Sequence, residues 1–243
     1  MTSKVSKVKT YFENTTLYLN NNNGIKTRAK IVKCFAENRV YNSTLDIPCG
    51  DGSISFPLIN QVKRLTLIDI SKNMINLAKQ TFSEEKKVEF FNNDIFELDL
   101  EANSFDLILC IGILAHVDDP SEFLTKITSL LSHNGVLILQ NTDADHFYTR
   151  LVKKIRGQKN LIQQNGGYEM NSISDTDIKN HAHDLGLKLL QTYRYDSNLP
   201  FISKFLSQEQ NYQLTWKIFG EPNDNRFGYL GNKCLYKFSK VEK

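Results

Sequence analysis

The segment from Leu45 to Ser53 constrains the fold of this chain more than any other, because a short apolar run enters a turn with two glycines. Gly50 and Gly52 can take positive φ angles and let a ligand approach the backbone closely. A turn of this kind after a strand predicts a helix that begins at Ser53, with its free N–H groups facing the same crevice. The segment is therefore predicted to bind a ligand.

Two common nucleotide-binding motifs do not match this turn. A dinucleotide fingerprint needs a third glycine where the chain has Ser55, and a P-loop needs a Lys-Ser/Thr pair that does not follow Gly52. The residues instead resemble the first motif of the class I S-adenosylmethionine-dependent methyltransferases, a strand ending in an acid before a D-x-G-x-G turn. Asp46, Gly50 and Gly52 match that motif, and Pro48 stands where the family usually has its first glycine.

β-prone runs alternate with amphipathic helical patterns along the chain, which predicts a doubly wound α/β fold. The resemblance implies seven strands in a mostly parallel sheet whose last strand is antiparallel. The expected strands are residues 43–47, 65–69, 88–91, 105–110, 136–140, 187–195 and 229–238. The helix before the fifth strand is expected to begin after an N-cap at Asp119 and to end at Asn134-Gly135.

The whole chain, residues 1–243, is interpreted as a single methyltransferase domain. Residues 1–24 are expected to form a helical flap over the cofactor, with Tyr11 and Tyr18 placed to close on it, although packing roles explain both tyrosines equally well. Residues 141–170 and 199–225 are insertions after the fifth and sixth strands. They are expected to form substrate lids, because ligands of α/β sheets bind beyond the carboxyl ends of the strands.

Acidic residues at the ends of the first three strands are the main candidates for binding the cofactor. Asp69 follows Asp46 by 23 residues, near the spacing of about 20 at which a carboxylate reaches ribose hydroxyls, although an acid here also suits a helix start. The resemblance implies that Asp94 and Ile95 hold the adenine, whereas N-N-D alone is an ordinary turn. The residues predicted to bind S-adenosylmethionine are Tyr18, Asp46, Pro48, Cys49, Gly50, Gly52, Asp69, Ile70, Met74, Asn93, Asp94, Ile95, Cys110 and Ile111.

Two histidines are candidates for a catalytic base. Methyl transfer from a sulfonium depends mainly on orientation and water exclusion, and it needs a base only where the acceptor is protonated and weakly acidic. His116 follows the fourth strand and is the first candidate; a packed or capping histidine is the alternative. His146, on the loop after the fifth strand, is the second, with Asp143 and Asp145 as partners.

The resemblance is to the small-molecule branch of the family, which includes quinone, sugar and natural-product methyltransferases. It implies methyl transfer to a hydroxyl, or less readily an amine, of a small molecule. Amino-group methylases of nucleic acids or proteins usually carry D/N-P-P-Y/F after the fourth strand, where this chain reads Ile111-Gly112-Ile113-Leu114. An RNA methyltransferase and a non-catalytic regulatory subunit are the alternatives. The basic run Lys153–Lys159 is either a grip for an anionic substrate or a solvated helix face.

Composition limits the partners and the cellular location that are expected for this chain. A net charge of +3 is too small to indicate nucleic acid, and no apolar run of 18 residues predicts membrane insertion. The N-terminal residues carry no apolar signal core, so a cytoplasmic location is expected. Four scattered cysteines are predicted to be free thiols, mostly buried, rather than disulfides or metal ligands. A monomer and a homodimer are both consistent with the sequence.

Overall fold

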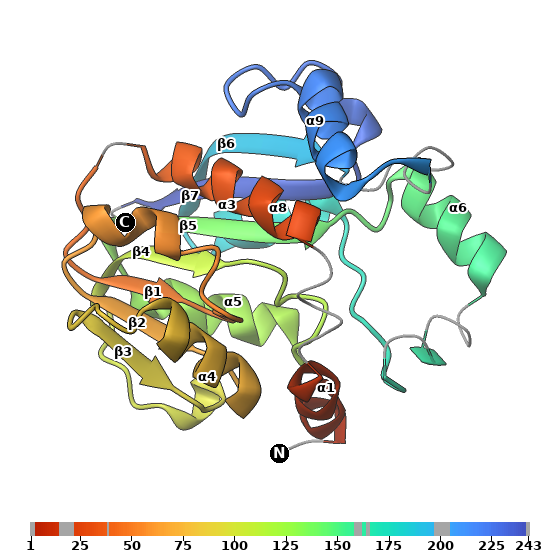
Figure 1. Ribbon diagram of the computed structural model, residues 1–243. Coiled ribbons are helices and arrows are strands. Elements are labelled where there is room, and N and C mark those ends of the chain that lie inside the picture. Colours follow the sequence, from red (N-terminus) through yellow and green to blue (C-terminus); the bar gives the residue numbers. More distant parts are fainter. Residues whose placement is uncertain are drawn as a thin grey trace.

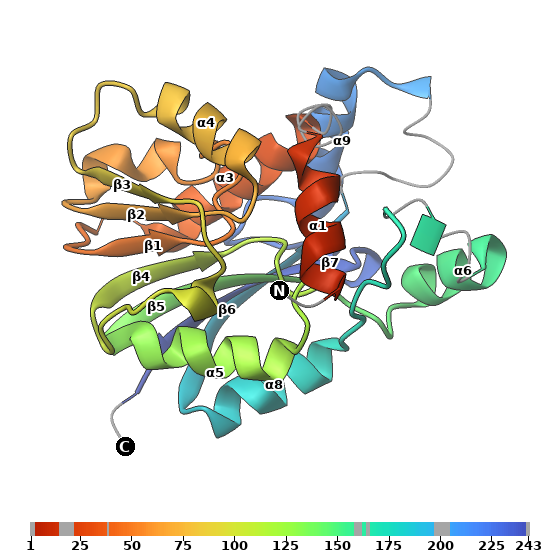
Figure 2. The same ribbon diagram turned by 90° about the horizontal axis from the view of Figure 1, so that it is seen from below.

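The computed structural model describes residues 3–14, 22–37, 39–157, 162–163, 166–196 and 205–241. These residues form a central sheet between two layers of helices, which confirms the predicted doubly wound α/β fold (Figures 1 and 2). Tyr18 lies outside the described residues. Within the described part, no helix is long and apolar enough to cross a membrane.

The described residues build a seven-stranded sheet in the order β3-β2-β1-β4-β5-β7-β6. Strands β1 to β5 are parallel, and β7 is antiparallel to both of its neighbours, as predicted. The strand order reverses beside β1, where ligands of α/β sheets usually bind. The strands are β1 Thr44–Asp46, β2 Leu65–Ile68, β3 Val88–Phe91, β4 Phe105–Cys110, β5 Leu131–Thr142, β6 Leu187–Tyr195 and β7 Lys233–Lys240.

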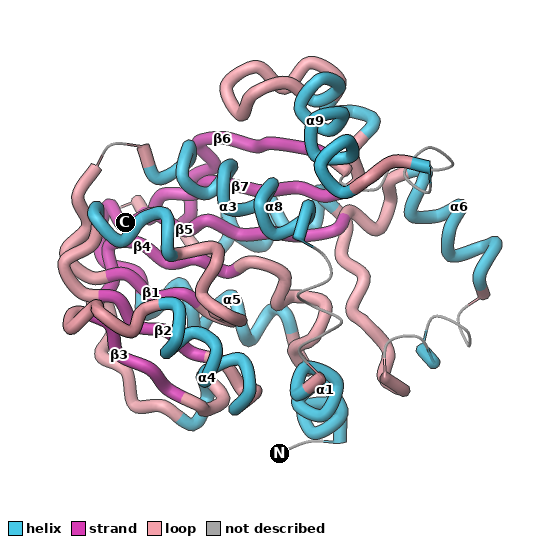
Figure 3. Tube along the Cα trace, in the orientation of Figure 1, coloured by secondary structure: helices cyan, strands magenta, loops and turns pink. Residues whose placement is uncertain are grey.

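The helices divide between the two faces of the sheet and one of its edges. In Figure 2, α3, α4 and α9 cover one face, and α5 and α8 cover the other. Figure 3 shows α1 and α6 apart from both layers, near the loops at one end of the strands. The helical elements are α1 Ser3–Glu13, α3 Asn22–Ala36, η1 Phe56–Gln61, α4 Lys72–Thr81, η2 Ile95–Glu97, α5 Pro120–Leu130, α6 Phe147–Arg156, α8 Asp175–Asp184, α9 Gln208–Phe219 and η4 Gly228–Leu230.

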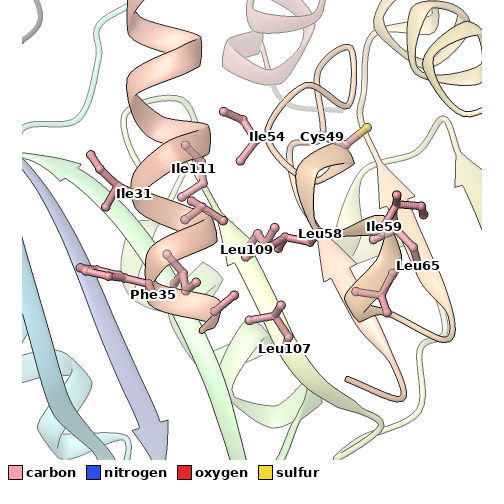
Figure 4. Close-up of a cluster of buried hydrophobic side chains, with 14 of the residues drawn as sticks. Ile31, Phe35, Cys49, Ile54, Leu58, Ile59, Leu65, Leu107, Leu109 and Ile111 are labelled. Carbon is pink, nitrogen blue, oxygen red and sulfur yellow. The ribbon is translucent and has the colours of Figure 1, made fainter. Parts of the chain in front are cut away.

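Strand β4 shows why the sheet needs helices on both faces. Leu107 and Leu109 are fully buried on one face, in a cluster that includes Phe35 of α3 (Figure 4). Ile108 and Cys110 alternate with them and are fully buried in the cluster on the α5 side. Successive side chains of a strand point to opposite faces of the sheet, so consecutive apolar residues are all buried only when both faces are covered. The continuous apolar run in the sequence was therefore a correct indicator of a central strand.

The N-cap predicted at Asp119 and the predicted free thiols are also confirmed, and serines cap two further helices. Ser71, Asp119 and Ser174 cap α4, α5 and α8, and each side chain accepts a backbone N–H of the first turn. All four cysteines are free thiols, and three of them are buried, whereas Cys34 is only half-buried.

The predicted helix start at Ser53 is wrong. Ser53 donates its backbone N–H and its hydroxyl to the carboxylate of Asp51, at 3.1 and 2.7 Å. A bond from an Asp side chain to the N–H two residues on can also cap a helix, so these bonds do not by themselves prevent one. The chain passes through turns instead and reaches only the 3-10 helix η1, which begins at Phe56.

Two other boundaries differ from the predictions. Helix α5 ends at Leu130, and Asn134-Gly135 lies inside β5, where the pairing with β4 shifts register. Asn134 takes a φ of 57°, so the residues that resembled a helix end form an irregularity within a strand. Strand β7 begins at Lys233, because residues 228–230 form η4.

Replacing Gly52 by alanine should destabilise the fold by about 2 to 4 kcal/mol. Its φ is +81°, and a Cβ there would lie 2.5 Å from the ring of Phe82. Gly167 is a matched control, because its φ is +82° and no described residue has an atom within 4 Å of its Cβ position. Gly167→Ala should cost only about 1 kcal/mol. Urea unfolding of both variants measures the difference, and equal losses would contradict the packing argument.

Candidate functional site

A cavity of about 380 Å³ opens at the carboxyl ends of β1, β2 and β4 and is covered by α1. Its volume lies within the range of small-molecule pockets, roughly 300 to 1,000 Å³. Most of the residues that were predicted to bind the cofactor, and one of the two candidate bases, lie in its walls. They are Pro48, Gly50, Asp69, Ile70, Met74, Asn93, Asp94, Ile95, Ile111 and His116.

Asp69 joins the ends of β1 and β2. Its two carboxylate oxygens accept the backbone N–H groups of Gly50 and Ser71, at 3.0 and 2.8 Å. Gly50 holds a φ of 54°, which turns its N–H toward this carboxylate. Burial raises the pKa of Asp69 to about 6, and the two backbone bonds oppose that rise. Each oxygen keeps a second lone pair, so the carboxylate can still accept hydrogen bonds from a diol.

Asp46 lies beneath the same turn and is fully buried. Neither of its carboxylate oxygens has a hydrogen-bond partner among the described residues. Burial raises its pKa to about 7, and the nearby Ser55 hydroxyl offsets only part of that rise. Buried polar atoms are nearly always paired, so this orphaned carboxyl is typical of a functional site rather than of a core.

Four predicted binding residues are not cavity walls. Cys49 and Cys110 pack in the two hydrophobic clusters, and Gly52 packs against Phe82. Asp46 lies below the wall rather than in it. These residues pack around the glycine turn and beneath it. They do not line the cavity, because successive residues at a strand end point in different directions and only some of them face the ligand side.

The far end of the cavity lies at the end of β3. Asp94 caps η2, and its Oδ1 accepts the N–H of Phe96 at 3.1 Å. Ile95 is buried in the wall, and Asn93 borders it. Phe96 also lines the cavity and was missed by the sequence analysis, although an aromatic residue directly after Asp94-Ile95 was an available signal.

Helix α1 covers the cavity with apolar side chains. Val5, Val8 and Phe12 line it, and the Phe12 ring lies 5.1 Å from the ring of His116. The carboxylate of Glu13 accepts the N–H groups of Lys72 and Asn73 at the start of α4, at 3.0 and 3.2 Å. A carboxylate is favoured at a helix N-terminus, so Glu13 holds the end of α1 over the cavity.

Arg28 of α3 brings a positive charge into the wall and was not predicted. Its Nε donates to the carbonyl of Gly24 at 3.0 Å, and its Nη1 lies near Gly112, just after β4. Arg28 forms no ion pair with a described residue. An unpaired guanidinium in a cavity is a ready partner for a carboxylate. Its position in the helix before the glycine turn offered no motif that could mark it.

His116 also lies in the wall of the cavity. Its Nδ1 is 2.8 Å from the hydroxyl of Tyr168, which is buried and was also missed by the sequence analysis. Burial lowers the pKa of His116 to about 4, with a smaller contribution from Lys4. The imidazole is therefore neutral at neutral pH. The glycine pair before Tyr168 predicted only a turn.

The structure does not support His146 as a base. Its Nδ1 accepts the N–H of Tyr148 as the cap of α6, and its Nε2 is 3.1 Å from the carbonyl of Tyr229. Both ring nitrogens are thus used in packing the loop, and His146 is not a wall of the cavity. Asp143, its expected partner, pairs with Arg194 at 2.6 Å.

The family-model comparison decides which class of protein has this cavity. Residues 41–212 match the model of a methyltransferase domain, which is more than half of the chain. This chain belongs to the class I S-adenosylmethionine-dependent methyltransferases. Its cofactor is S-adenosylmethionine, and the sequence resemblance is confirmed.

Curated relatives of this methyltransferase are named as O-methyltransferases. A ubiquinone biosynthesis O-methyltransferase of Rickettsia akari is 26% identical over 203 residues, which are 78% of this chain and 71% of that protein. A malonyl-[acyl-carrier protein] O-methyltransferase of Halalkalibacterium halodurans is 29% identical over 109 residues. That match covers 43% of this chain and only 40% of the relative.

Solved structures share the fold of the methyltransferase at low sequence identity. An S-adenosylmethionine-dependent methyltransferase from Thermotoga maritima aligns with a TM-score of 0.66 and 17% identity, covering 96% of this chain and 99% of the other. Magnesium protoporphyrin IX methyltransferase from Synechocystis, solved with bound S-adenosylhomocysteine, aligns with a TM-score of 0.65 and 16% identity. That alignment covers 98% of this chain and 100% of the other.

The two insertions of the methyltransferase take different positions. Met170, at the end of the first insertion, is a wall of the cavity. In the second, none of the described residues, 205–225, lines the cavity. Trp216 of α9 instead packs against the cluster below α3 and stacks with Tyr193 of β6 at 6.1 Å. The lid role of both insertions stays a prediction.

The Asp46→Asn variant should be more stable than the wild type by about 2 to 4 kcal/mol above about pH 7. The folded state raises the pKa of Asp46, so it binds this proton more tightly than the unfolded chain does. Wild-type stability should therefore fall as pH rises from about 4 to about 7, and the difference should vanish below about pH 4. Urea unfolding across pH measures this, with the exposed Asp99→Asn as control. A difference that does not change with pH would contradict it.

Proposed function

We propose that this methyltransferase transfers a methyl group to a hydroxyl of a small-molecule acceptor. The observation that carries the proposal is a neutral imidazole, His116, in the same cavity as the Asp69 carboxylate and the Gly50 turn. A hydroxyl acceptor must lose its proton, and a neutral histidine can take it. The names of the curated relatives, which are O-methyltransferases, support the same reaction.

The cavity residues divide between the parts of the cofactor. Asp69 would accept the two ribose hydroxyls, and Asp94 with Ile95 would hold the adenine. The Gly50 turn would lie against the methionine portion, and the guanidinium of Arg28 would pair with its carboxylate. The spare lone pairs of the Asp69 carboxylate, which lines the cavity, support this fit. When bound, the cofactor supplies an electrophilic methyl group on a positively charged sulfur.

His116 would act through Nε2. In the tautomer that leaves Nε2 unprotonated, Nδ1–H donates to the oxygen of Tyr168, and that bond fixes the orientation of the ring. Nε2 then accepts the proton of the acceptor hydroxyl as its oxygen is methylated. Tyr168 is a positioning residue, because it acts through His116. A base with a pKa near 4 is weak, so its contribution belongs at the lower end of general-base catalysis.

The walls around His116 favour an acceptor with an apolar body. Val5, Val8, Phe12, Val117 and Met170 line this part of the cavity. Such walls exclude water from the line of transfer and hold an apolar group by burial. Residues 1–24 are proposed as the flap, since α1 provides three of these side chains. The free thiols suit a reducing compartment, and we place the reaction in the cytoplasm.

Cofactor binding tests the core of the proposal. Titration calorimetry should show S-adenosylhomocysteine binding to the wild type, and Asp69→Ala should weaken it about 100-fold, because two charge-assisted hydrogen bonds are lost. Asp99→Ala is the control for charge, and thermal unfolding checks that Asp69→Ala stays folded. Unchanged affinity in Asp69→Ala would remove the ribose assignment.

The pH dependence tests the base. The assay uses an acceptor found in a panel of hydroxylated aromatic and sugar compounds, and saturating cofactor, so that cofactor binding is not limiting when Asp69, with its pKa of about 6, titrates. Under these conditions kcat/KM for the acceptor should stay level down to about pH 5 and fall near pH 4, because His116 remains unprotonated above its lowered pKa. His116→Gln should lower kcat about 100-fold and leave S-adenosylhomocysteine affinity unchanged. An acid limb near pH 6.5 that persists in His116→Gln would exclude His116 as the base.

A further inference from the structure

Helix α6 stands apart from the rest of the molecule. Figures 1 and 2 show it beyond the end of β5, away from the two helical layers that cover the sheet. One side of the helix is held by the body: His146 caps its first turn, and the hydroxyl of Thr149 accepts from the amide of Asn232 at 3.2 Å. Its other side faces solvent.

The solvent side of α6 carries large apolar side chains. Phe147, Leu151 and Ile155 are 62, 47 and 73% exposed. Their spacing of four residues places them in one stripe along the helix. The ring of Phe147 lies 4.5 Å from the ring of His146, and the greater part of the stripe is open to solvent. A contiguous exposed apolar stripe on a folded protein usually marks an interaction site.

Positive charge borders the stripe. Arg150 and Lys154 are exposed and precede Leu151 and Ile155, so they lie along the edge of the stripe. From His146 to Gly157 the sequence contains no Asp or Glu that would offset these charges. A helix with an apolar stripe and a basic border matches the headgroup region of an anionic bilayer.

We propose that the solvent face of α6 docks on the surface of an anionic lipid bilayer. The helix has 10 residues and so is about 15 Å long, half of the roughly 30 Å hydrocarbon thickness. It therefore lies in the plane of the surface with Phe147, Leu151 and Ile155 inserted. Pairing of this face with itself in a second copy is disfavoured, because Arg150 and Lys154 would meet like charges.

Docking through α6 places the cavity close to the lipid surface. The helix follows the carboxyl end of β5, the sheet edge that also carries the cavity, and the segment after it returns to place Tyr168 against His116. An acceptor dissolved in the bilayer would then have a short path to the cavity. The docking itself does not depend on methyl transfer, so the two proposals are tested separately.

Vesicle flotation with the full chain tests the docking. The wild type should float with vesicles that mix phosphatidylcholine and phosphatidylglycerol, float weakly with phosphatidylcholine alone, and lose binding as NaCl is raised. Ile155→Glu should weaken binding about tenfold or more, because it removes an apolar side chain that would insert into the bilayer and adds a charge that anionic lipids repel. The double variant Arg150→Glu/Lys154→Glu should lose the preference for the anionic vesicles.

Controls separate docking from folding and from activity. Val40→Glu changes another exposed apolar residue, 58% exposed, before β1 at the opposite sheet edge, and should float like the wild type. All variants should bind S-adenosylhomocysteine with wild-type affinity. Absence of wild-type flotation, or equal flotation of Ile155→Glu, overturns the proposal. A wild-type dimer that Ile155→Glu converts to a monomer, without vesicle binding, would assign the face to a second copy instead.

Discussion

The carboxylate of Asp69 is the contact on which the geometry of the cavity depends. It accepts the N–H groups of Gly50 and Ser71, and its own backbone carbonyl accepts the amide of Asn92 at 3.0 Å. These bonds link the loops after β1, β2 and β3. Parallel strands bring their carboxyl ends to one edge, but the loops beyond them have no ladder bonds to hold them. A buried carboxylate with two acceptor oxygens supplies that link and keeps lone pairs for a ligand.

The same edge concentrates polar groups that burial disfavours. Burial raises the pKa values of Asp46 and Asp69 and lowers the pKa of His116. Each of these groups alone would destabilise the fold, and the sheet tolerates them because its strands are packed on both faces. Buried ionisable groups that lack enough hydrogen bonds to offset their loss of hydration are typical of functional sites, where a ligand supplies the missing contacts.

The insertion after β5 connects two features at a distance. Tyr168, near its end, orients His116, whereas α6, at its start, presents Phe147, Leu151 and Ile155 to solvent. Residues in one chain segment thus serve the cavity and the outer surface. The basic run alone would be consistent with an ordinary solvated helix. A solvated helix has no need of exposed large apolar side chains, so their presence beside the run indicates an interaction surface.

The sequence by itself determined the fold class, the order of the strands along the chain and the acids at the strand ends, because alternation, helical periodicity and turn residues are local properties. The position of Asp69 was predictable for that reason, whereas Asp94 was singled out by the resemblance to the family. Tertiary structure decided which side chains meet across the cavity. Arg28, Val5 and Tyr168 come from distant segments, and His146 is used as a helix cap, because no local pattern encodes where a helix outside the sheet will pack. The helix predicted at Ser53 is also absent: after Gly52 the chain passes through turns and reaches only the 3-10 helix that begins at Phe56.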